Sequence, residues 1–157
     1  MIYLSFDIEE FDMPKEYGYD IAFERQIAIS RKGLTAILDL LKKHQMRATF
    51  FSTVVFAQQV PDLINRLIEE GHELASHTYY HSDFENEHLK RSKEALEQQF
   101  GVTVEGLRMP RMLEVSAEEV KKAGYRYNSS VNPTFLPGRY NKLHVPKRFF
   151  NENGLWQ

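Results

Sequence analysis

Side chains suited to metal binding and to acid–base chemistry follow three predicted strands of this 157-residue chain. Asp7 and Glu9 follow the first apolar segment. His77 and His81 follow a later segment, and Arg108 follows the next one. In parallel α/β sheets, functional residues collect where the carboxyl ends of the strands meet. We therefore expect carboxylates, imidazoles and a guanidinium along one rim of the fold.

The two histidines of this set have the spacing of a metal site. His77 and His81 lie four residues apart, and on one helical turn their Cβ atoms would be about 5–6 Å apart. Such a pair can bind one Zn²⁺, and a carboxylate from the first strand end would leave a fourth position for water. The chain has no cysteine, so its metal ligands must be His, Asp or Glu. The other histidines are interpreted as surface or structural residues: His44, His72, His88 and His144.

The elements that must position these residues alternate between short apolar runs and amphipathic segments. The predicted strands are residues 2–6, 47–53, 72–76, 104–107 and 125–129. The predicted helices are residues 25–44, a segment from Pro61 that ends at Gly71, residues 83–100, and a short helix closed by Gly124. Strands that alternate with helices indicate an α/β fold with a parallel sheet, and right-handed crossovers would curve it toward a barrel.

Local signals define the helices more closely. Leu34, Ile37, Leu38 and Leu41 form one apolar stripe. Capping-box spacing at Ser82 and Glu85, repeated at Ser116 and Glu119, predicts two helix starts. Residues 12–22 are predicted to be a loop long enough to be functional, and after Asn132 the regular pattern stops.

In this order, the segments resemble the polysaccharide deacetylases that contain a NodB homology domain, carbohydrate esterase family 4. The resemblance covers roughly residues 2–130. The segments that carry it are Phe6-Asp7-Ile8-Glu9, Thr49-Phe50-Phe51, Ser76-His77-Thr78-Tyr79-Tyr80-His81, Arg108-Met109-Pro110 and Gly124-Tyr125-Arg126-Tyr127-Asn128-Ser129-Ser130. The histidine segment is the most specific of them. The resemblance implies a distorted seven-stranded (β/α) barrel.

The resemblance also implies a role for each site residue. Asp7 would be the general base, and Arg108 would pair with it and keep it charged and oriented. Glu9, His77 and His81 would bind Zn²⁺ or another divalent transition metal. The backbone N–H of Arg111 would lie near the developing oxyanion. The substrate would be an N-acetylated glycan, from which a metal-dependent hydrolase removes acetyl groups.

Three positions depart from the family pattern. Ile8 separates two acids that are usually adjacent, and Arg111 and Met112 stand where an aromatic residue and a glycine are usual. The family's fifth motif, with its histidine general acid, has no counterpart before Gln157. We therefore expect residues 1–157 to form a single domain that is incomplete at its C-terminal end. Partner chains, such as copies in a homo-oligomer, would cover the exposed sheet edges and apolar surface.

Two alternatives to an N-acetyl-glycan hydrolase stay open. The altered first and third motifs favour a hydrolase of a smaller acyl amide or a cyclic C–N bond. The absent fifth motif favours a non-catalytic carbohydrate-binding module on the same scaffold. Exposed aromatic residues would stack on sugar rings in either glycan-binding case, and the candidates are Tyr17, Tyr19, Tyr79 and Tyr80.

Composition excludes other classes of function. A formal net charge of -2 gives no overall field for binding nucleic acid or anionic lipid. No apolar run approaches the roughly 20 residues of a membrane span. The opening residues lack the basic start and apolar stretch of a signal peptide, so we expect a cytoplasmic protein.

Overall fold

The computed structural model describes residues 3–138 and 140–157, and a seven-stranded sheet runs through it. The strand order is β1-β2-β3-β4-β5-β9-β8, and every neighbouring pair is parallel except β8 with β9. The strands of this sheet are β1 (Ser5–Ile8), β2 (Thr49–Ser52), β3 (Glu73–Ser76), β4 (Gly106–Leu107), β5 (Tyr127–Asn128), β8 (Asn151–Glu152) and β9 (Leu155–Trp156). A separate antiparallel hairpin joins β6 (Phe135–Leu136) and β7 (Tyr140–Asn141).

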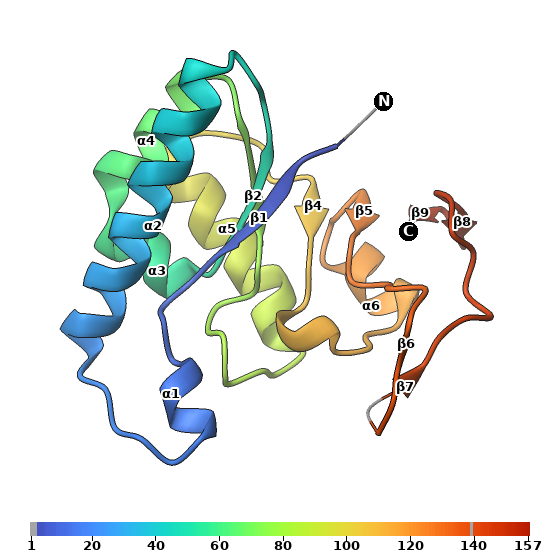
Figure 1. Cartoon of the computed structure of the whole chain (residues 1–157). Helices are drawn as coiled ribbons and strands as arrows, with labels where there is room; N and C mark the ends of the chain where they lie inside the picture. The colour runs from blue at the N-terminus through green and yellow to red at the C-terminus, as the bar shows by residue number, and fades with distance from the viewer. Residues whose placement is uncertain (1–2, 139) are drawn as a thin grey trace.

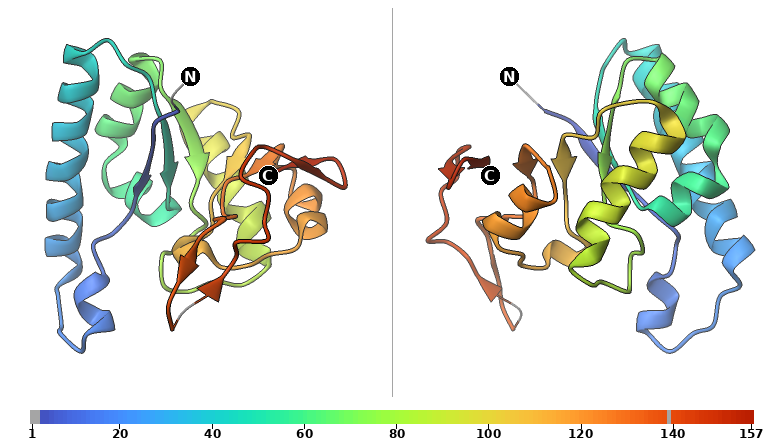
Figure 2. Two further views of the ribbon diagram at one scale, coloured as in Figure 1. Left: turned by 45° about the vertical axis from the view of Figure 1, so that its right-hand side comes forward. Right: turned by 180° about the vertical axis from the view of Figure 1, so that it is seen from behind.

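Helices connect the parallel strands, as the alternation of the sequence predicts. They are α1 (Met13–Glu16), α2 (Phe23–Lys43), α3 (Val54–Gln59), α4 (Pro61–Glu69), α5 (Glu87–Phe100) and α6 (Ala117–Lys122), with a short 3₁₀ turn, η1, at Pro110–Met112. Figures 1 and 2 show α2 at one side of the molecule and the hairpins of the C-terminal segment at the opposite side. Within the described residues the sheet does not close, because β1 and β8 form its two edges. The fold is therefore an α/β barrel type that is open on one side.

The hydrophobic core lies between the helices and the sheet. The predicted stripe of α2 is confirmed, since Leu34, Leu38 and Leu41 are buried and Ile37 packs against the core. Phe50 of β2 is fully buried and stacks on Phe6 with ring centroids 5.4 Å apart. Alternation along β1 thus directs Phe6 and Ile8 to the core and leaves Ser5 and Asp7 exposed on the other side.

Two of the local predictions had different outcomes. At α6, the Ser116 hydroxyl accepts a hydrogen bond from the N–H of Glu119 at 3.2 Å, which confirms the predicted cap. The predicted start of a helix near residue 83 is wrong, because α5 begins at Glu87. The hydroxyl of Ser82 donates to Asp12 and accepts from Arg111. The N–H of Glu85 donates to Nδ1 of His88 instead. A tertiary contact has replaced the local one.

Other elements were absent from the sequence prediction. The predicted loop at residues 12–22 contains α1, and the segment after residue 132 contains four two-residue strands. Such short elements carry no periodicity from which they could be predicted. The strand predicted at residues 2–6 is shifted to Ser5–Ile8, and Met1 and Ile2 lie outside the described residues.

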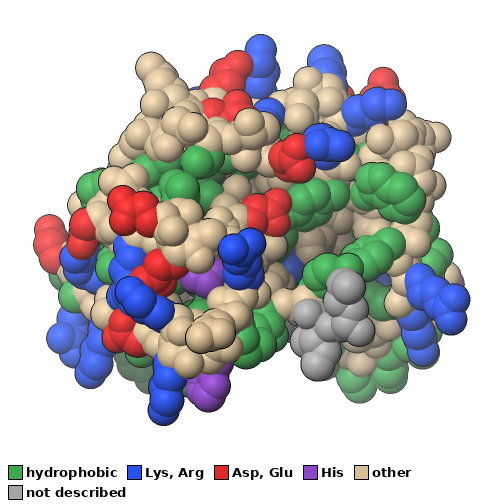
Figure 3. Space-filling view, turned by 90° about the horizontal axis from the view of Figure 1, so that it is seen from above, with side chains coloured by type: hydrophobic (Ala, Val, Ile, Leu, Met, Phe, Trp, Pro, Cys, Tyr) green, Lys and Arg blue, Asp and Glu red, His purple; other side chains and the backbone are tan. Residues whose placement is uncertain are grey.

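On the face shown in Figure 3, basic and acidic side chains are interspersed, as a net charge of -2 leads one to expect. Among residues 3–138 and 140–157, no helix has the length and apolar character needed to cross a membrane.

Candidate metal centre and hydrolytic site

The ends of β1 and β3 bring three possible metal ligands together. Glu9 follows β1, and His77 and His81 follow β3. The Nε2 atom of His77 lies 3.0 Å from Oε2 of Glu9, and Nε2 of His81 lies 3.4 Å from Oε1 of the same carboxylate. Ligand atoms of all three residues lie within 4.8 Å of one another. The structure therefore assembles the three residues that the sequence suggested as metal ligands.

The other nitrogen of each imidazole ring has its own partner. Nδ1 of His77 lies 2.7 Å from the carbonyl oxygen of Arg108, and Nδ1 of His81 lies 2.7 Å from Oδ1 of Asp12. A carbonyl oxygen can only accept a hydrogen bond, and so can an ionised carboxylate. In the neutral form of either ring, Nδ1 is therefore the protonated nitrogen and the lone pair of Nε2 faces Glu9.

This arrangement of charge fits a bound cation. Two lone pairs and a carboxylate that converge on one point repel each other unless positive charge lies between them. Oε2 of Glu9 is buried and has no hydrogen-bond partner among the described residues, which is costly for a carboxylate oxygen. Two imidazole nitrogens and one carboxylate are a common ligand set of catalytic zinc sites. Glu9, His77 and His81 thus fit a divalent transition metal.

The backbone between the two histidines is not helical, although their spacing would also suit one helical turn. Thr78 has a left-handed backbone with φ of 66°, and its hydroxyl donates to the carbonyl of Tyr80 at 2.9 Å. This turn carries His81 back beside His77, with ring centroids 6.0 Å apart. The structure therefore brings the two histidines together, but through a local geometry that differs from a helical turn.

Arg108 holds the candidate base at the rim. Its Nη1 donates to Oδ1 of Asp7 at 2.8 Å, and the side chain of Asp7 is about one-third exposed. Its Nη2 donates to the hydroxyls of Ser5 at 2.9 Å and Ser129 at 2.8 Å. The guanidinium also lies 4.1 Å from the centre of the Phe51 ring. Contacts to β1, β2 and the end of β5 therefore fix Arg108 and, through it, Asp7.

Two further acids of the first strand end also reach the site, and the sequence prediction missed them. Glu10 is buried and accepts hydrogen bonds from the hydroxyl of Thr53 at 2.7 Å and from the backbone N–H of His81 at 3.1 Å. Asp12 is buried against the ring of His81. The structure thus directs Glu9, and not Glu10, toward the imidazole rings. Several acids close together were the only sequence signal of these supporting contacts.

Arg111 has an unusual backbone at the same rim. Arg111 and Met112 both have left-handed φ values, 54° and 55°, a strained conformation that is often found at functional sites. The side chain of Arg111 donates to Oε1 of Glu16 at 2.8 Å and to the hydroxyl of Ser82 at 3.0 Å. The predicted role of its backbone N–H near an oxyanion stays a prediction.

The histidines outside the metal group differ in their surroundings. Burial lowers the pKa of His72, whose Nδ1 accepts the N–H of Ala48 at 3.2 Å. His88 is buried, and its ring contacts Tyr79, Tyr80 and Phe84. It forms a second possible ligand group with Glu85 and Glu87, both of which are exposed. Both rings are buried, and the structural role expected for them stays a prediction.

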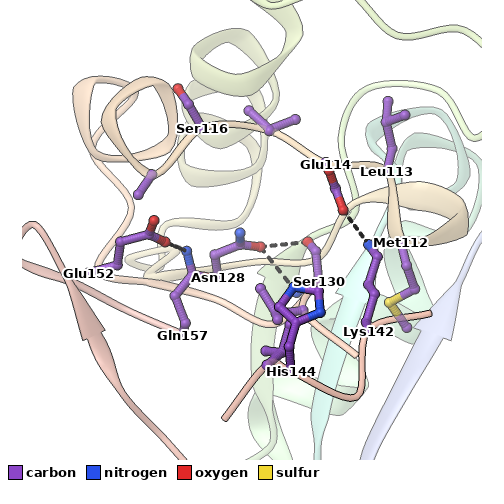
Figure 4. A pocket seen from close by; sticks show the side chains of 14 residues that line it. Met112, Leu113, Glu114, Ser116, Asn128, Ser130, Lys142, His144, Glu152 and Gln157 are labelled. Carbon is purple, nitrogen blue, oxygen red and sulfur yellow. Dashed lines mark hydrogen bonds and ion pairs between the residues drawn. The ribbon is translucent and has the colours of Figure 1, made fainter. Parts of the chain in front are cut away.

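His144 lines a cavity of about 330 Å³ that contains none of the candidate site residues. Figure 4 shows this cavity, with Lys142 paired to Glu114 and Ser130 bonded to Asn128. Ser129 faces Arg108, whereas the next residue, Ser130, faces the cavity and binds the N–H of Met109 at 2.8 Å. The cavity therefore lies apart from the contact that Ser129 makes with Arg108.

Comparisons with known proteins identify the family of this chain. A family model described as "Polysaccharide deacetylase" matches residues 1–128. Peptidoglycan-N-acetylmuramic acid deacetylase PdaA of Bacillus subtilis is 33% identical over 100 residues, which cover 57% of this chain and 38% of PdaA. The chain thus spans well under two thirds of that relative.

Solved structures are also similar to this chain in fold. The Bc1960 peptidoglycan N-acetylglucosamine deacetylase matches with a TM-score of 0.54 and 27% identity, over 77% of this chain and 50% of that one. Puue allantoinase matches with a TM-score of 0.61 and 20% identity, over 80% of this chain and 52% of that one, and shows the shared fold alone. The family model covers most of the chain, and the chain therefore belongs to the polysaccharide deacetylase family.

Proposed function

We propose that this chain provides the metal-binding part of a hydrolase that removes N-acetyl groups from an amino-sugar polymer. The observation that carries the proposal is the convergence of Glu9, His77 and His81 beside the Asp7–Arg108 pair. Membership of the polysaccharide deacetylase family supports N-deacetylation as the reaction. Related proteins named for peptidoglycan deacetylation support an amino-sugar polymer as the substrate class.

In the proposed reaction, Glu9, His77 and His81 would hold a divalent cation, most simply Zn²⁺. Such a cation, when bound, would supply Lewis-acid chemistry that makes water more acidic and polarises a carbonyl group. Asp7 would take a proton from the attacking water as general base. Oδ1 of Asp7 already accepts a hydrogen bond from Arg108, so Oδ2 is the oxygen that would take the proton. The contacts of Arg108 to Ser5 and Ser129 keep the carboxylate in one orientation during the transfer.

Exposed aromatic residues near the rim suit a sugar ligand. Tyr17 and Tyr19, which follow α1, are about 70% exposed. Tyr79 and Tyr80 are less available, because they pack on each other and on His88. We therefore assign sugar stacking to Tyr17 and Tyr19 in preference to the other pair.

The test is an activity screen of the full chain loaded with Zn²⁺. N-acetylglucosamine oligomers are compared with small acyl amides and cyclic amides, and released acetate and free amine are measured. We expect acetate release from the oligomers that is lost in Asp7→Asn. Activity on the small amides alone would replace the glycan by a smaller substrate. Oligomer binding by a chain that holds no metal would indicate a non-catalytic module instead.

A further inference from the structure

Asp12 occupies the N-cap position of α1 but does not cap the helix. An aspartate at this position usually accepts a hydrogen bond from the backbone N–H of the second or third helical residue. Here the Asp12 side chain makes no such bond, and only its backbone carbonyl accepts one, from Lys15 at 2.9 Å. Its carboxylate is nevertheless buried, with the whole residue 6% exposed. The side chain therefore has a partner outside its own helix.

Both oxygens of Asp12 bind residues of the loop that follows β3. Oδ1 accepts the Nδ1 proton of His81 at 2.7 Å, and Oδ2 accepts the hydroxyl proton of Ser82. A carboxylate held at both oxygens cannot rotate without breaking one of the bonds. The ring of His81 is consequently fixed in one orientation, with Nε2 directed at Glu9.

The contacts continue to the third strand end of the rim. Arg111, which follows β4, donates to the hydroxyl of Ser82 at 3.0 Å and to Glu16 at 2.8 Å. Glu16 lies in α1, the helix that Asp12 precedes. Hydrogen bonds thus connect the segments after β1, β3 and β4 in a closed path that includes Asp12.

We propose that Asp12 is a positioning residue that sets the tautomer and orientation of His81 for metal binding. This inference rests on the proposed metal site and adds a residue to it. Partners that bind the outer nitrogen of a metal-bound histidine fix the ring and make it a better ligand, and their loss typically reduces metal affinity by about 10–100-fold. Ser82 and Arg111 hold Asp12 in place for this role.

The test compares Zn²⁺ dissociation constants of the full chain, measured by competition with a chromophoric chelator. We expect Asp12→Ala to weaken Zn²⁺ binding by about 10–100-fold. Asp12→Asn keeps an oxygen that can accept the Nδ1 proton, so its loss should be smaller. Asp20→Ala is the matched control, because Asp20 is an exposed acid of the same loop, and it should stay within about twofold of the original affinity.

A second measurement reads the tautomer directly and does not depend on the variants folding. Nitrogen-15 spectra of the histidines in the Zn²⁺-loaded protein should show His81 with a proton on Nδ1 and the metal on Nε2. A purely structural role for Asp12 would lower stability and leave both the tautomer and the Zn²⁺ affinity of the folded protein unchanged.

The outcomes separate this inference from the proposed function. Failure of the unmutated chain to bind Zn²⁺ would contradict the metal site itself. Tight binding by the unmutated chain together with about equal binding by Asp12→Ala would overturn only the role of Asp12. A His81 ring that binds Zn²⁺ through Nδ1 would overturn it as well, even if Asp12→Ala proved unable to fold.

Discussion

Residues 3–130 and residues 131–157 of this protein differ in what holds them in place. The first region contains all the candidate site residues, and buried helices and strands support them. In the second region, Leu155 is the only buried residue among those described, while Phe149 is 74% exposed and Trp156 is 55% exposed. The family model also ends at residue 128. We infer that the first region carries the chemistry and most of the stability, and that Leu155 is the main contribution of the second region.

The largest expected effect concerns the chemistry. Asp7→Asn should reduce turnover by about 10²–10⁴-fold, the usual contribution of a general base, while zinc stays bound. His144→Ala is the matched change in the second region. It should leave turnover within about twofold, because His144 lines a cavity without site residues. Steady-state kinetics with metal analysis measure both. A large loss in His144→Ala would show that the second region contributes to catalysis.

Stability should differ between the regions in the same way. Phe50→Ala removes a fully buried ring of β2 and should lower the free energy of unfolding by about 3–5 kcal/mol. Phe149→Ala removes an exposed ring and should change it by less than about 0.5 kcal/mol. Urea denaturation followed by circular dichroism gives both values. Similar losses in the two variants would contradict the difference between the regions.

Leu155 tests how the second region is held, because its side chain belongs to the hydrophobic core. Its side chain is fully buried in β9, which pairs with β5. Leu155→Ala should destabilise the chain by about 2–4 kcal/mol and expose residues of the second region to protease. Limited proteolysis with mass spectrometry would identify the first cleavage sites. Protection of residues 131–157 equal to that of the original chain would show that other contacts hold them.

The smallest expected effect is the pH dependence contributed by His72 in the first region. Burial lowers the pKa of His72, so the folded state binds a proton less readily than the unfolded state. The unfolded state then holds more protons below about pH 6.5, and stability should fall as the pH is lowered through that range. Replacement by Gln, which does not titrate, should flatten this dependence. An unchanged difference between pH 5 and pH 8 in His72→Gln would contradict the assignment.

Periodicity in the sequence predicted the elements that pack against the core. The stripe of α2 repeats every three or four residues because one face of a helix must be buried, and the structure buries it. The same reasoning identified strands whose carboxyl ends supply Glu9, His77 and Arg108. Sequence periodicity was therefore sufficient to predict those helices and strands that pack one face against the core.

Long-range contacts could not be predicted in this way. Asp12 and His81 are 69 residues apart in the sequence, and only the fold brings them to 2.7 Å. Ser82 has the spacing of a helix cap, yet it bonds to Asp12 and Arg111, and α5 begins only at Glu87. The left-handed backbone of Thr78 likewise depends on hydrogen bonds to its neighbours, and no periodic pattern indicates it.

The most direct test of the central claim is a zinc analysis of the purified chain beside His77→Ala. If Glu9, His77 and His81 form one metal site, the original chain should hold about one Zn²⁺ and the variant should lose nearly all of it. Both proteins should have the same circular dichroism spectrum, because His77 lies at the rim and not within a helix. A folded original chain that holds no zinc, or a variant that retains it fully, would contradict the account.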